Sequence, residues 1–143
     1  MPRASKRILN KNIYEELEDH FSFLISSLHS SQDIERFFSD FLTSEEKSML
    51  TKRLMLHLML ENGYTVSHIK AVLNMSRETI RVHQHVWGKG GNTYKVMLQK
   101  IAHREKTKEF WKKVEQILRP FDLALQSKTN MKARAKIAGK DYQ

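Results

Sequence analysis

The apolar side chains of this 143-residue chain recur at intervals of three and four residues, and no long run alternates apolar with polar residues. One such stripe follows a helical face through Ile13, Leu17, Phe21, Leu24 and Leu28. Glycine and proline, which disfavour helix interiors, occur only five and two times. A helical period without strand alternation predicts an all-α fold.

The same periodicity predicts six helices, at about residues 8–29, 34–42, 44–62, 66–73, 77–87 and 93–118. Thr43 and Glu46 have the spacing of a capping box at the third helix, and Gly63 has the place of its C-terminal glycine. We expect Pro120 to end the last helix, because proline lacks the backbone N–H. The predicted organisation is a helical domain over 1–118 and a disordered basic tail over 119–143, which has little apolar surface to bury.

The third predicted helix is apolar on nearly every side, with Leu, Met and His filling residues 54–60. Such a helix must be buried all round. It is either the central helix of a monomer or a helix enclosed within a dimer, and its pattern alone does not separate the two.

Charge divides the chain sharply. Residues 11–64 carry a net charge of −5, whereas residues 65–118 carry +7 and residues 119–143 carry +4. A scattered solubility charge would not separate in this way. The basic part therefore indicates a polyanion partner.

Several classes of function are disfavoured. The chain has no cysteine, which excludes disulfides, thiolate metal sites and cysteine nucleophiles. No phosphate-binding loop is present, and the glycine-rich stretch GKGGN follows a predicted helix instead of a strand. No stretch is long and apolar enough for a membrane span or a signal peptide. We therefore expect a cytoplasmic protein that is not an enzyme, does not bind a membrane, and has no metal or other cofactor.

Residues 65–87 read as two short helices joined by a tight turn, which is the pattern of a helix-turn-helix. Thr65 and Ser76 are suitable N-caps, and Asn74 tolerates the left-handed conformation that the turn needs. The residues spaced to pack against one another across the turn are Ile69, Leu73, Ile80 and Trp87.

The second of these helices presents long hydrogen-bonding side chains in its first turns, as a helix that reads DNA bases in the major groove requires. The candidates for base reading are Arg77, Glu78 and Arg81. The candidates for phosphate contacts are Thr65, Ser67, Lys70 and Lys89. Possible further DNA contacts are His83, Gln84 and His85.

The stretches LTSEEKSMLTKRL, ENGYTVSHIKAVLNMSRETI and GGNTYKVML carry a resemblance to a known family. In their order and spacing they resemble the Trp-repressor-like superfamily, and its YerC/YecD branch in particular. The resemblance implies a six-helix fold that contains a helix-turn-helix and dimerises by intertwining its outer helices. It also implies binding to double-stranded DNA.

The chain departs from the family at the site where the Trp repressor holds its corepressor. Arg53 and Thr43 stand at the positions of one clamping arginine and a supporting threonine. Val82 stands at the position of the second arginine, and Val86 at that of a nearby serine. This departure makes tryptophan an unlikely effector and leaves any other small-molecule effector unknown.

The resulting prediction is a sequence-specific DNA-binding transcriptional regulator, a repressor, that acts as a homodimer through its helix-turn-helix. Two alternatives stay open. One is the DNA-end-binding module of a mobile element, which uses similar helix-turn-helix units. The other is a helical dimer adaptor whose basic face binds RNA or an acidic protein.

Overall fold

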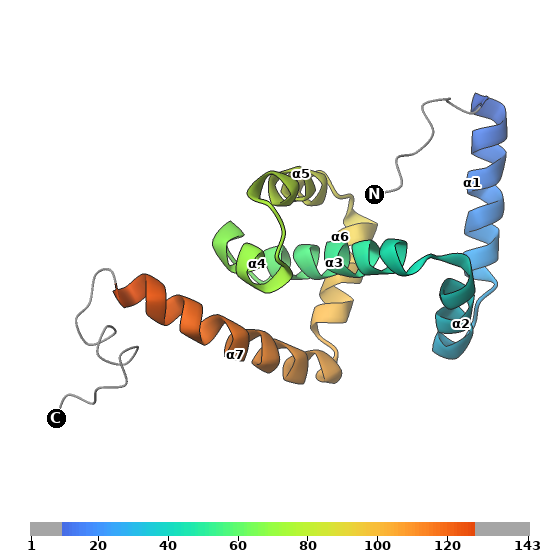
Figure 1. The fold of residues 1–143 in the computed structure, drawn as a ribbon. Coiled ribbons are helices and arrows are strands. Elements are labelled where there is room, and N and C mark those ends of the chain that lie inside the picture. Colours follow the sequence, from blue (N-terminus) through green and yellow to red (C-terminus); the bar gives the residue numbers. More distant parts are fainter. Residues whose placement is uncertain (1–9, 128–143) are drawn as a thin grey trace. The chain divides into compact units, whose positions relative to one another are not determined.

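A computed structural model describes residues 10–127 of the chain, and within them the only regular secondary structure is helical (Figure 1). The helices are α1 (Lys11–Ser26), α2 (Ser31–Phe41), α3 (Ser44–Glu61), α4 (Val66–Leu73), α5 (Arg77–Gly88), α6 (Asn92–Ala102) and α7 (Glu105–Ser127). The all-α prediction is confirmed for this part of the chain.

The chain forms two compact units, Met1–Thr51 and Lys52–Gln143, so that the boundary falls within α3. The first unit holds α1, α2 and the N-terminal turns of α3. The second holds the rest of α3 and helices α4 to α7.

The first unit leaves its apolar side chains largely open to solvent, and neither α1 nor α2 has a buried residue. The two helices meet where the ring of Phe21 lies 5.9 Å from that of Phe41. Ile13 and Leu17, which belong to the predicted apolar stripe of α1, are each about half exposed at 51%. The stripe is therefore present, and within the described residues most of it stays exposed.

Helix α3 begins with the predicted capping box: Thr43 N donates to Glu46 Oε2 at 3.0 Å, and Glu46 N donates to Thr43 Oγ1 at 3.2 Å. Its last five residues before Glu61 are buried, but Leu50 and Leu54 are 44% and 42% exposed. The expectation of burial all round holds in this chain only for the C-terminal half of the helix. The helix ends at Glu61, and Gly63 just beyond it has a positive φ of 77°, at which a side chain would incur a steric penalty.

The core of the second unit is built from the C-terminal half of α3 and from α4, α5 and α7. Its buried members are Leu56, Met59, Leu60, Ile69, Leu73, Ile80, Val114 and Leu118. Helix α4 packs against α5 on one side and α7 on another.

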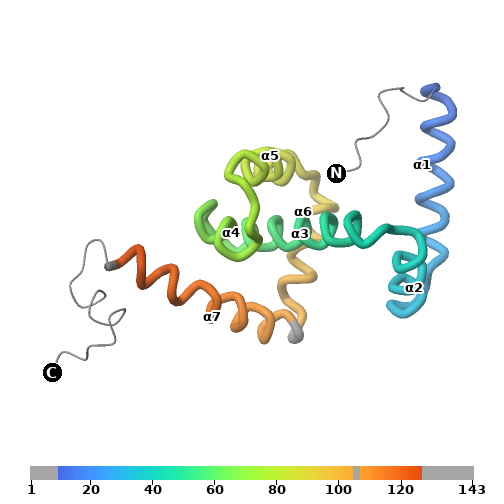
Figure 2. Tube along the Cα trace, in the orientation of Figure 1, coloured from blue at the N-terminus to red at the C-terminus, as the bar shows by residue number. Residues whose placement is uncertain are grey.

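The single helix predicted over 93–118 is two helices, and the break falls within the polar stretch 102–109, where the sequence indicates a kink or a projection into solvent. The chain turns at His103 and Arg104, so that α6 and α7 are separate helices (Figure 2). The Thr107 hydroxyl donates to the Ile101 carbonyl at 2.8 Å, and Arg104 N donates to the same carbonyl. The turn therefore supplies hydrogen-bond donors to a carbonyl in the last turn of α6. Seven helices result within residues 10–127, where the resemblance implies six.

The expectation that Pro120 stops the last helix is wrong, since α7 continues through it to Ser127. A proline inside a helix loses one backbone hydrogen bond. The residues just beyond it, Phe121 and Asp122, contact His68 of α4, as described below. Residues 119–127 of the expected tail are thus helical, and residues 128–143 lie outside the described part of the chain.

Candidate nucleic-acid interface

Helices α4 and α5 are each capped at the N-terminus by the residue that the sequence predicts. Thr65 Oγ1 accepts from His68 N at 3.3 Å, and Ser76 Oγ accepts from Thr79 N at 3.1 Å. Between the helices, Asn74 takes the left-handed conformation with φ 50° and ψ 49°. These caps define a turn of three residues, Asn74 to Ser76, which fixes the direction in which α5 leaves α4.

The inner face of this helix pair lies in the core of the second unit. Ile69 and Ile80 are completely buried, and Leu73 is 9% exposed. Trp87 is partly buried and packs against the same cluster, while its Nε1 donates to Glu61 Oε2 at 3.1 Å. Helix α5 is therefore held to α3 by both apolar packing and a hydrogen bond.

The three base-reading candidates, Arg77, Glu78 and Arg81, are all exposed on α5. Ile80, which lies between them in sequence, faces the core. At about 100° per residue, Arg77, Arg81 and Glu78 lie roughly 60°, 100° and 160° around the helix from Ile80. The three exposed side chains therefore occupy the flank and the far side of α5.

The phosphate candidates differ in their surroundings. Lys70 on α4 and Lys89 after α5 are exposed. Ser67 is partly buried. Thr65 is exposed, but its hydroxyl is engaged with His68 in capping α4.

Of the possible further contacts, Gln84 and His85 are exposed, whereas His83 is partly buried. The His83 ring lies against His57 of α3, with 5.8 Å between ring centroids. Burial and the positive charge of Arg53 lower the pKa of His83. His83 is therefore less accessible to a ligand than Gln84 and His85.

His57 is the polar residue at the centre of this contact. It is 2% exposed, and its Nδ1 shares a hydrogen bond with the Tyr94 hydroxyl of α6. Burial first, and then the charges of His83 and Arg53, lower the pKa of His57. Among the described residues, Nε2 of His57, Nδ1 of His83 and Nε of Arg53 are buried and have no hydrogen-bond partner. Such a cluster favours neutral histidines, because protonation would add charge to a site where charge is poorly solvated.

Residues of α7 contribute to the helix-turn-helix in a way that the sequence analysis missed. The Trp111 ring stacks on Tyr64 at 5.5 Å and 18°, and the Phe121 ring meets His68 edge-on at 5.8 Å. His68 Nε2 lies 3.0 Å from Asp122 Oδ1. A signal was available, since the apolar spacing of α7 continues past Pro120 to Phe121 and Leu125.

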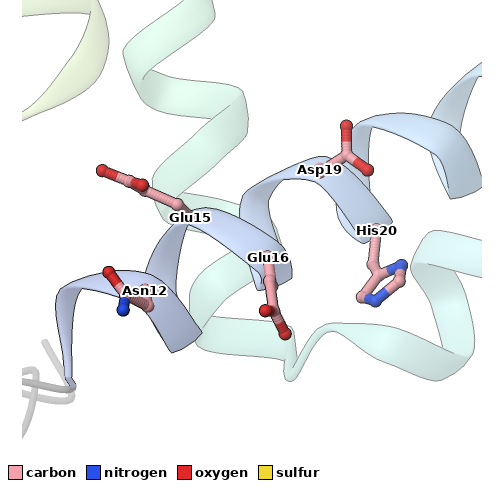
Figure 3. A pocket seen from close by; sticks show the side chains of 5 residues that line it. All are labelled: Asn12, Glu15, Glu16, Asp19 and His20. Carbon is pink, nitrogen blue, oxygen red and sulfur yellow. The ribbon is translucent and has the colours of Figure 1, made fainter.

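Helix α1 belongs to the acidic part of the chain. One shallow recess on this helix is lined by Asn12, Glu15, Glu16, Asp19 and His20 (Figure 3). The side chains drawn there point in different directions and do not converge on one point. Among the described residues, no three His, Asp or Glu side chains are grouped so that they could hold a metal ion. No helix in residues 10–127 is both long enough and apolar enough to cross a membrane.

A family model described as Trp repressor protein matches residues 16–102. No curated protein and no solved structure matches the chain. The family match ends with the last residue of α6, so α7 lies outside it.

Proposed function

Because the chain belongs to the Trp repressor protein family of helix-turn-helix DNA-binding regulators, we propose that it is a repressor that binds a specific operator as a homodimer. Each protomer places α5 in a major groove, and the two recognition helices lie about one helical turn, ~34 Å, apart. Repression follows when the bound dimer occludes a promoter.

The observation that carries this proposal is the division of α5 into two faces. Ile80 is completely buried, while Arg77, Glu78 and Arg81 are exposed. Arginine forks match the paired acceptors of guanine, and a glutamate accepts from the amino group of cytosine. A recognition helix needs this arrangement of a fixed inner face and a reading outer face.

Homodimerisation is supported by the apolar surface of the first unit. The exposed large apolar side chains there include Ile13, Tyr14, Leu17, Phe21, Phe23, Leu24, Ile34, Phe41 and Leu50. Many large apolar side chains exposed on one unit favour an interaction site over a solvated face. Two-fold pairing of this unit buries that surface and presents two recognition helices to one duplex.

The test is a selection of random duplexes by the purified protein at near-physiological salt, followed by sequencing. We expect a two-fold symmetric motif whose half-site spacing matches one helical turn. Salt-sensitive binding without a motif would contradict the proposal and favour the adaptor that binds RNA or an acidic protein. The mobile-element alternative predicts an asymmetric motif found at element ends.

A further inference from the structure

A groove lies between α4 and the C-terminal part of α7, two helices that pack against each other in the second unit (Figure 1). Its volume is about 420 Å³. Ligand pockets span ~300–1,000 Å³, so a groove of this size suits a small molecule. Its lining includes Lys70, Ala71 and Asn74 from α4 and its C-cap, Arg77 from α5, and Phe121 and Leu125 from α7.

One wall of the groove is apolar and belongs to α7. Phe121 and Leu125 are four residues apart, so they lie on one face of the helix. Phe121 is partly buried with its ring against His68, whereas Leu125 is 46% exposed. Ala71, across the groove on α4, contributes only a methyl group. The apolar part of a ligand can therefore displace water from this wall and be stabilised by burial there.

The other part of the groove is cationic. Lys70 and Arg77 are both exposed, and neither forms an ion pair with another described residue. The side-chain amide of Asn74, at the turn between α4 and α5, adds a hydrogen-bond donor. Among the described residues no acid lines the groove, because Asp122 contacts His68 instead. A carboxylate fits this part, since a guanidinium can bind it through two parallel hydrogen bonds.

A bound duplex alone does not account for both parts of the groove. The phosphates of DNA suit the two cations, but a phosphate backbone offers little apolar surface to Phe121 and Leu125. The apolar wall also lies outside the family match, which ends at residue 102. The groove includes none of Arg53, Val82 and Val86, so it is separate from the corepressor positions that the resemblance implies.

We propose that this groove binds a small organic carboxylate with an apolar body, and that the bound ligand releases the protein from DNA. The apolar body lies on Phe121 and Leu125, and the carboxylate pairs with Lys70 and Arg77. The release rests on the proposed function, because Lys70 and Arg77 are the predicted phosphate and base contacts. A ligand that engages both cations withdraws them from the duplex and acts as an inducer.

The probe for this site is hydrocinnamate, a phenyl ring joined to a carboxylate through two methylene groups. Hydrocinnamamide has the same body without the charge, and acetate has the charge without the body. Amide chemical shifts of the isotopically labelled protein, measured without DNA, report which residues each compound reaches. We expect saturable shifts from hydrocinnamate in α4 and the last turns of α7. The dissociation constant should be on the order of 1 mM, because the probe is small and the groove is open.

Variants of the two parts of the groove test the contacts separately. Leu125→Gln removes half of the apolar wall and is expected to weaken hydrocinnamate binding roughly tenfold. Ile117→Gln, which changes a residue of α7 that is 58% exposed and outside the groove, is the matched control and keeps the native affinity. Ala71→Leu fills the groove at little cost in helix propensity and is expected to prevent binding. Arg77→Ala weakens hydrocinnamate roughly fivefold and leaves hydrocinnamamide unchanged.

Several results would overturn the ligand site. Shifts from acetate that equal those from hydrocinnamate would make the groove a plain anion site of the kind that a DNA phosphate occupies. Equal affinity for hydrocinnamamide would show that Lys70 and Arg77 take no part. Shifts confined to α1 and α2, or an equal loss in Leu125→Gln and Ile117→Gln, would indicate unspecific contact with exposed apolar side chains.

Release from DNA is measured by titrating the operator duplex in about 10 mM hydrocinnamate, with acetate at equal ionic strength as the control. At about ten times its dissociation constant, a fully competing ligand weakens duplex binding about elevenfold. We expect Leu125→Gln to bind the operator as tightly as the native chain but to lose this response. Unchanged operator binding by a native chain whose α4 and α7 amides are shifted would overturn the role as an inducer.

The two proposals fail in distinguishable ways. If the native chain does not prefer the operator over a shuffled duplex, the proposed function fails, while the shifts in α4 and α7 still decide the ligand site. If it does prefer the operator but Leu125→Gln and the native chain respond alike to hydrocinnamate, the inference about the groove fails and the proposed function stands.

Discussion

The imidazole of His68 lies 3.0 Å from the carboxylate of Asp122, and this contact joins the first helix of the helix-turn-helix to α7. The same imidazole takes part in the capping box of α4, where its Nδ1 lies 3.3 Å from Thr65 N. One side chain therefore serves both the start of α4 and its attachment to α7. An eight-residue helix is marginal by itself, so α4 depends on such tertiary contacts.

We expect Asp122→Asn to loosen α4 without unfolding the protein. The Asp122 side chain is 47% exposed, so the pair contributes no more than about 1 kcal/mol to the free energy of unfolding. The measurable result is faster amide hydrogen exchange in α4 than in α3. Glu109→Gln, an exposed site on the same helix, is the control and leaves the exchange of α4 unchanged. Exchange that is equally fast in both variants would contradict a specific role for the pair.

Substitution of the exposed arginines of α5 tests base reading. We expect Arg77→Ala or Arg81→Ala to weaken binding to the operator by ~1–3 kcal/mol and to relax the preference at one base position. Lys70→Ala, on α4, is the matched control and weakens binding to all duplexes alike, with a salt slope lower by about 1. Binding isotherms on the operator and on single-base variants measure both effects. A loss from Arg77→Ala that is equal on every duplex would assign Arg77 to the phosphates.

The histidine pair between α3 and α5 predicts how stability depends on pH. The pKa values of His57 and His83 are both lowered in the folded protein, whereas both groups titrate near 6.5 when unfolded. Below pH 6.5 the unfolded chain therefore binds more protons than the folded one. The stability is fully present above pH 6.5 and falls as the pH decreases, by at most about 1.4 kcal/mol per pH unit for each histidine.

We expect His57→Gln to flatten this pH dependence between pH 7.5 and 5, even though it lowers stability at pH 7.5 by disturbing the contact with Tyr94. Denaturant unfolding at a series of pH values measures the effect. His85→Gln on the exposed face of α5 is the control and keeps the native pH dependence. An unchanged slope in His57→Gln would show that other groups control the acid sensitivity.

The parts of the fold that could be predicted from the sequence are those governed by neighbouring residues. The caps at Thr43, Thr65 and Ser76 and the left-handed Asn74 depend on atoms three or four residues away, so their signals are local. The burial of Ile69 and Ile80 on one face followed from the helical period for the same reason.

The parts that could not be predicted depend on long-range contacts. His68 and Asp122 are 54 residues apart, and no periodic pattern links them. Pro120 reads as a helix stop until the partners of Phe121 and Asp122 on α4 are known. His83 looks like a surface residue in its polar sequence context, and only the fold brings it against His57.

The apolar stripe of α1 predicts the association state. We expect the native chain to scatter light as a dimer at tens of micromolar, and Leu17→Glu to shift it towards monomer by placing a charge in the stripe. Leu17 is 51% exposed in the single chain, so the substitution creates no cavity there. Asn12→Glu adds the same charge near the start of α1 and keeps the dimer, since an acid is favourable at a helix N-terminus. A native chain that is monomeric under these conditions would contradict the homodimer.

The valines of α5 predict the response to tryptophan. Val82 and Val86 are 55% and 52% exposed. The resemblance in sequence implies that they stand where the Trp repressor has an arginine and a serine. Arg53 remains, but a single arginine cannot enclose the indole ring of tryptophan from both sides. We expect titration calorimetry of the native chain with L-tryptophan to give no saturable heat. The double variant Val82→Arg, Val86→Ser restores the missing donors and is expected to gain measurable affinity. Micromolar binding by the native chain would instead show that Arg53 and its neighbours suffice, and would make tryptophan a candidate effector.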